Sequence, residues 1–108
     1  MSIGLSGAAG AARGAVRWRR VSALQLVTQP VGAGLACYSC PSGETHILDA
    51  FPAEIFRQLP ERSPGVSAEA VAESIAGEFD EATAAWRGRV ESALEQMARL
   101  ALVVSDDP

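Results

Sequence analysis

Cys37, Cys40 and His46 are the side chains of this 108-residue sequence whose types most often carry out chemistry. The cysteines form a Cys-x-x-Cys pair, which is redox-active where the amino end of a helix lowers a thiol pKa. This pair instead ends an expected strand and precedes a turn. A zinc site needs four ligands, usually from two such pairs, and here only His46 could join. We expect both cysteines to be small structural residues, with a redox or metal role as the alternative.

His46 also lacks the partners of a catalytic histidine. No serine stands in a sharp turn like that of a nucleophile elbow, and no carboxylate has a telling spacing to the imidazole. Gly32 and Gly34 precede an expected strand rather than a helix, so they offer no helix amino end to a phosphate. We therefore expect no catalytic residue, no cofactor and no metal, which favours a protein that is not an enzyme.

The charge balance of the chain disfavours nucleic acid as a partner. Thirteen acidic residues stand against nine basic ones, and the net charge is −4. A negatively charged domain is repelled by a phosphate backbone. Residues 13–20 hold a cluster of four arginines with Trp18 among them. A winged-helix nucleic-acid-binding or regulatory module that uses this cluster is the alternative function.

Residues 1–16 are predicted to be a flexible leader rich in glycine and alanine. Their first charge, Arg13, follows the weakly apolar part, which is the wrong order for a secretory signal. No run reaches the roughly 18 apolar residues that a membrane span needs. We therefore expect a cytoplasmic protein with no membrane contact, and a polar tail over residues 105–108.

Alternation and turn residues predict three strands, at residues 24–28, 35–39 and 44–48. Residues 40–43 are too short for anything but an antiparallel connection between the last two strands. The period then changes to that of helices. The first is capped by Asp49 and stopped by Pro60, the second is capped by Ser67, and the third starts at Asp80 or Thr83 and runs to Val104.

This order, βββααα, predicts an α+β domain over residues 17–104 with a winged helix-turn-helix-like fold. A three-stranded antiparallel sheet would pack one face on three amphipathic helices, because three strands cannot bury a face alone. The third strand is expected at the edge of the sheet. Its unpaired backbone groups would be a template for an added peptide strand.

Residues 18–104 resemble the PqqD-like peptide chaperones, which are the recognition elements for precursors of ribosomally made, modified peptides. The nearest subgroup is the PqqD family of the HPr-rel-A system. The resemblance is carried by Trp18, by Tyr38, by the segment Ser-Gly-Glu-Thr-His-Ile-Leu-Asp at residues 42–49, and by Leu-Ala-Leu-Val at residues 100–103. Two positions depart from the subgroup pattern: Ser39 stands where it has His, and Ala101 where it often has Gly.

The resemblance implies a non-catalytic chaperone that binds the leader of a precursor peptide as an added strand. It would present that peptide to a modifying enzyme, such as a radical SAM or kinase-like protein. Carried over by predicted element, the peptide would lie along the third strand and against the third helix, at Glu44, Thr45, His46, Ile47, Leu48, Arg87, Val90, Glu91 and Leu94. A free strand edge also leaves self-pairing into a homodimer open.

Overall fold

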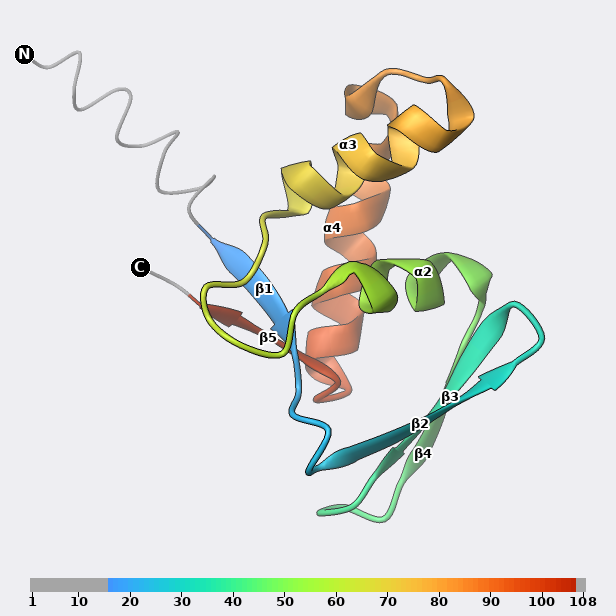
Figure 1. The fold of residues 1–108 in the computed structure, drawn as a ribbon, viewed down its shortest axis with the longest axis vertical. Helices are drawn as coiled ribbons and strands as arrows, with labels where there is room; N and C mark the ends of the chain where they lie inside the picture. The colour runs from blue at the N-terminus through green and yellow to red at the C-terminus, as the bar shows by residue number, and fades with distance from the viewer. Residues whose placement is uncertain (1–15, 107–108) are drawn as a thin grey trace, which may run out of the picture.

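The computed structural model describes residues 16–106 of the chain, and Figure 1 shows their arrangement. The predicted leader lies almost wholly outside these residues. The elements follow in the order β1 (Arg17–Arg20), β2 (Leu26–Val31), β3 (Gly34–Ser39), β4 (Thr45–Leu48), α2 (Ala50–Gln58), α3 (Ala68–Phe79), α4 (Thr83–Arg99) and β5 (Val103–Asp106). The predicted α+β order is confirmed, and one further strand is added at each end.

Strands β2, β3 and β4 form an antiparallel sheet in that order. Gly32 takes a φ of +61°, as the first position of a tight type II′ turn requires, and lets β2 turn into β3 through two residues. Along the sheet, Leu26, Leu35, Cys37 and Leu48 are buried on the face toward the helices. The neighbouring residues Val27, Val31, Tyr38 and Ile47 are exposed on the other face.

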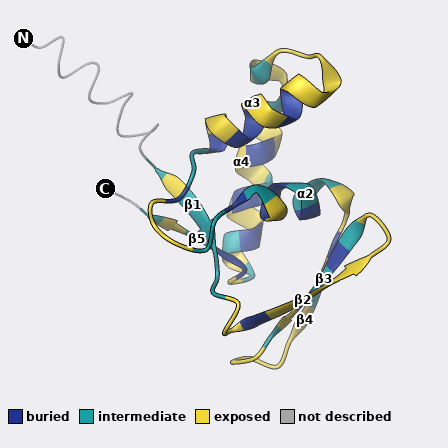
Figure 2. Ribbon diagram, in the orientation of Figure 1, coloured by how far each residue is buried: buried dark blue, intermediate teal, exposed yellow. Residues whose placement is uncertain are grey.

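Helix α2 begins after Asp49 as predicted, and α3 begins after Ser67, whose hydroxyl accepts a hydrogen bond from the Ala70 amide. The helices pack their apolar sides on one another and on the sheet, and Figure 2 shows their buried sides turned inward. The largest buried side chains are Ile55, Phe56, Leu59, Val71, Ile75, Val90, Leu94, Met97, Leu102 and Val103. This single core fixes the position of α4 relative to β4.

The carboxyl end of the chain differs from the expectation. Helix α4 ends at Arg99 rather than at Val104, and Ala101 turns the chain with a left-handed φ of 62°. Residues 103–106 then form β5, although residues 105–108 were expected to be a polar tail. The strand forms because Val103–Asp106 finds a backbone partner in β1, far away in the sequence. The two sheets lie on opposite sides of α4 in Figure 1.

The part of the arginine cluster at residues 17–20 belongs to the folded domain. It forms β1, which pairs with β5 on one side and with Val66 on the other. Arg19 forms an ion pair with Asp106, with 3.2 Å between Nε and Oδ1, and Arg17 donates a hydrogen bond to the Gly65 carbonyl. The guanidinium of Arg20 lies over the Phe56 ring. These three arginines therefore hold the fold together, while Arg13 lies outside the described residues.

Candidate functional site

The free edge of β4 is the first feature of the candidate site. The Ser39 amide donates to the Glu44 carbonyl at 2.8 Å, so the backbone groups of every second β3 residue face β4. The β4 partners of these residues, His46 and Leu48, therefore direct their own groups back to β3. It follows that the amides and carbonyls of Thr45 and Ile47 point out from the sheet, where no other described strand lies.

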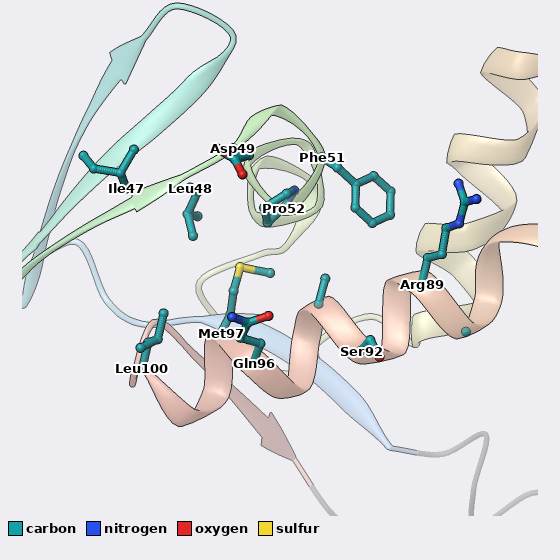
Figure 3. A pocket seen from close by; sticks show the side chains of 12 residues that line it. Ile47, Leu48, Asp49, Phe51, Pro52, Arg89, Ser92, Gln96, Met97 and Leu100 are labelled. Atoms are coloured by element: carbon teal, nitrogen blue, oxygen red, sulfur yellow. The ribbon is translucent and has the colours of Figure 1, made fainter.

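A cleft of about 680 Å³ lies beside this edge, between β4, the first turn of α2 and one side of α4. Figure 3 shows Leu48 and Met97 pointing toward each other across it, while Ile47 points away from α4. Leu48 and Met97 are almost fully buried, so they form its apolar base. Its lining is Ile47, Leu48, Asp49, Phe51, Pro52, Gly88, Arg89, Ser92, Ala93, Gln96, Met97 and Leu100. The cleft is thus apolar in the middle and polar along its rims.

A second cleft of about 570 Å³ continues toward the other end of β4 and shares Leu100 with the first. Glu44 and His46 lie there, with 3.5 Å between the glutamate Oε1 and the imidazole Nε2. Arg99 and Ser39 also line it. This second cleft is lined by residues of β2, β3 and β4 and so lies over the helix-facing side of the sheet, whereas the first cleft borders β4 at Ile47 and Leu48. An extended chain beside β4 would thus meet α4 next to Ile47 and Leu48.

The expected site residues divide into two groups in the structure. The five β4-region residues from Glu44 to Leu48 all border one of the two clefts or the open edge, although Leu48 is buried. The four α4 residues do not. Val90 and Leu94 have no exposed surface, and Arg87 pairs with Glu69 of α3. Glu91 stands one turn after Arg87 on the same side of the helix.

The cleft is instead lined by the adjacent side of α4, with Arg89, Ser92, Ala93, Gln96 and Leu100. These five residues repeat at three- and four-residue spacing, which marks one side of a helix. That spacing was visible in the sequence. Val90 and Leu94 belong to the apolar stripe of this helix, which packs into the core, and they were assigned to the site only by carry-over from the resemblance.

The end of the cleft at the start of α4 carries an aromatic cluster. The Trp86 ring stacks on Phe79 at 5.3 Å between centroids and lies 5.8 Å from Phe51. The guanidinium of Arg89 lies over the same Trp86 ring at 5.0 Å. Phe51 and Arg89 also line the cleft, so this end presents both an aromatic surface and a positive charge.

Neither cysteine of the Cys-x-x-Cys pair lines the cleft. Cys37 is buried and Cys40 is exposed, and both are free thiols. Burial raises the pKa of the Cys37 thiol, which favours its neutral form. Among residues 16–106, no three His, Cys, Asp or Glu side chains lie together in a metal-binding arrangement. The site therefore consists of a strand edge and a mixed apolar cleft.

Compared with protein-family models, with curated proteins and with solved structures, the chain matches none. Within the described residues, no helix has both the length and the apolar composition to cross a membrane.

Proposed function

We propose that this chain binds an extended peptide as a fourth strand beside β4, with part of the peptide held in the cleft against α4. The open edge of β4 next to that cleft is the observation that carries the proposal. Main-chain hydrogen bonds to Thr45 and Ile47 would supply affinity, and the cleft would select side chains. The chain contributes no chemistry of its own in this role, and it presents the peptide to a separate modifying enzyme.

The choice of β4 rather than β2 follows from Pro30. Leu35 directs its backbone groups to β4, so its β2 partner Pro30 directs its own nitrogen to the outer edge of β2. Proline has no amide hydrogen to offer there, and proline at an edge discourages strand pairing. Of the two edges of this sheet, β4 is therefore the one suited to accept another strand.

The presentation of the peptide to an enzyme rests on the resemblance to PqqD-like chaperones, whose matching segment at residues 42–49 spans β4 and the residues on either side of it. The precursor leader is the peptide that this resemblance suggests. The alternative, binding of nucleic acid through the arginine cluster, gains no support, because Arg17, Arg19 and Arg20 are engaged within the fold.

Peptide binding can be tested without knowledge of the natural partner. A phage-displayed library of random dodecapeptides is selected on the immobilised chain, and enriched sequences are synthesised with a fluorescent label. We expect saturable binding by fluorescence anisotropy and a loss of at least tenfold on Ile47→Asp. An aspartate there would place a charge beside the added strand, while the 62% exposed side chain of Ile47 can change without harm to the core.

Val31→Asp is the matched control. Val31 is 53% exposed on the same face of the sheet, but it lies in β2, on the far side from β4. We expect this variant to bind as the unchanged chain does. Equal losses in both variants would mean that peptides bind the open sheet face rather than the β4 edge, and absence of any enriched peptide would refute the proposed function.

A further inference from the structure

Arg89 is positioned at one end of the cleft as a cation without an acidic partner. Its guanidinium lies 5.0 Å from the centroid of the Trp86 ring, and no carboxylate of the described residues forms an ion pair with it. Stacking on an aromatic ring leaves the edge of a guanidinium, with its N–H donors, free to bind a carboxylate in a two-pronged contact. The Trp86 ring therefore holds the Arg89 guanidinium in place, and no carboxylate of the described residues occupies its N–H donors.

The sequence of α4 around Arg89 explains why this arginine has no acidic partner within its own helix. The positions three and four residues away are Ala85, Trp86, Ser92 and Ala93, and none of them is acidic. Arg87, two residues earlier, instead pairs with Glu69 of α3. The two arginines of the same helix turn therefore differ: one fastens α4 to α3, and the other faces the cleft with its donors free.

In Figure 3, Arg89 and Phe51 lie at one end of the cleft and Leu100 lies at the other end, with Leu48 and Met97 between them. Arg89 and Leu100 are eleven residues apart on one side of α4, or about 16 Å along the helix axis. An extended chain covers that length with about five residues. A peptide that places an apolar residue against Leu100 would reach Arg89 about five residues later.

We infer that the cleft selects a peptide with an acidic side chain at Arg89 and an apolar side chain about five residues away, against Leu100 and Met97. This inference rests on the proposed function and specifies which peptides it serves. The acidic side chain would accept hydrogen bonds from the Arg89 guanidinium. Because Trp86 and the helix already hold the guanidinium, little side-chain freedom is lost on binding. Because the net charge of the chain is −4, a local cation in the cleft would offset the repulsion that an acidic guest meets elsewhere on the surface.

The test compares the peptides that dodecapeptide display enriches on the unchanged chain and on two variants. We expect Asp or Glu at one fixed position with the unchanged chain, no preference there with Arg89→Gln, and Lys or Arg with Arg89→Glu. For an enriched peptide, Asp→Asn or Glu→Gln should weaken binding about tenfold or more, as loss of a charged hydrogen bond implies. The same peptide change should have little effect on the Arg89→Gln variant.

Two further variants distinguish the effect of the placement and shape of the Arg89 guanidinium from the effect of a positive charge alone. Arg62→Gln removes an exposed arginine outside the cleft, and we expect it to select the same peptides as the unchanged chain. Arg89→Lys keeps the charge but loses the planar fork and the stacking, and we expect only partial recovery of binding. Enriched peptides without an acidic preference would overturn the inference and leave peptide binding intact. Failure to enrich any peptide would overturn the proposed function, and this inference with it.

Discussion

At the scale of single residues, Cys37 and Cys40 have opposite environments although only two residues separate them. Cys37 points into the core from β3, and Cys40 lies exposed in the turn that follows. The sequence indicated two small structural residues rather than a shared site, and in the structure the two thiols lie in different surroundings. Cys37 lies on the helix-facing side of β3, whereas Cys40 follows the end of that strand at Ser39 and is not held against the core.

We expect a thiol reagent to label Cys40 rapidly in the folded protein and Cys37 only after unfolding, as mass spectrometry of the labelled chain would show. Burial and a raised pKa both protect Cys37. The raised pKa has a consequence for stability too. Above about pH 9, the ordinary value for this thiol, the unfolded state ionises first and the free energy of unfolding falls.

Cys37→Ala should therefore lose less stability between pH 8 and pH 10 than the unchanged chain does, in urea titrations at each pH. Val27→Ala, an uncharged change on the exposed face of the sheet, is the control, and its pH dependence should match that of the unchanged chain. Equal labelling rates of the two thiols in the folded protein would contradict the burial of Cys37.

At the scale of elements, sequence reasoning misread the ends of the chain, and it placed the first strand at residues 24–28 where β2 covers Leu26–Val31. The apolar residues Leu100 and Val104 continue the helical period, so α4 was expected to run to Val104. The helix ends earlier because the turn at Ala101 lets residues 103–106 pair with β1. The partner strand lies more than 80 residues away in the sequence, and no local sequence pattern predicts a pairing over that distance. Helices α2 and α3, set by local caps and local periodicity, began where they were predicted to begin.

The turn at Ala101 gives a stability prediction. Its φ of 62° is a conformation that costs an L-residue about 1–2 kcal/mol and costs glycine nothing in steric terms. We expect Ala101→Gly to raise the free energy of unfolding by about 0.5–1 kcal/mol, after the entropy of the unfolded chain is allowed for.

Ala98→Gly, three residues earlier inside α4, is the matched control and should lower that free energy by about 1 kcal/mol. Urea unfolding of both variants measures the two effects. A destabilised Ala101→Gly variant would show that the helix does not end with a left-handed residue there.

The segment between α2 and α3 gives the second prediction at this scale. Gly65 passes so close to β1 that a Cβ would come within 2.3 Å of the Trp18 carbonyl oxygen, next to the two Trp18–Val66 backbone hydrogen bonds. Gly65→Ala must displace this bridge, and we expect it to cost about 1–3 kcal/mol of unfolding free energy. Gly77→Ala, in open space inside α3, should instead stabilise by about 0.5–1 kcal/mol. Thermal unfolding of the two variants should thus shift in opposite directions.

At the scale of the whole molecule, the candidate site lies between β4, α2 and α4. The sequence predicted these elements but not their positions relative to one another. The edge strand was expected at residues 44–48 and β4 covers Thr45–Leu48, a close match because turn residues and alternation bound the strand. The side of α4 that faces β4 was not identified, because the positions on this helix were carried over by element alone, and Val90 and Leu94 among them are buried in the core. Only the packing of α3 and α2 on α4 decides which apolar residues are buried and which line the cleft.

Backbone amide hydrogen exchange, read residue by residue by NMR, tests the open edge of β4 most directly. In the free protein we expect the amides of His46 and Leu48 to be protected by β3, and those of Thr45 and Ile47 to exchange freely. Saturation with a peptide enriched by display should slow exchange at Thr45 and Ile47 at least tenfold, because an added strand would bind both amides. If these two amides are already protected in the free protein, or stay unprotected with peptide bound, the account of strand addition at β4 is wrong.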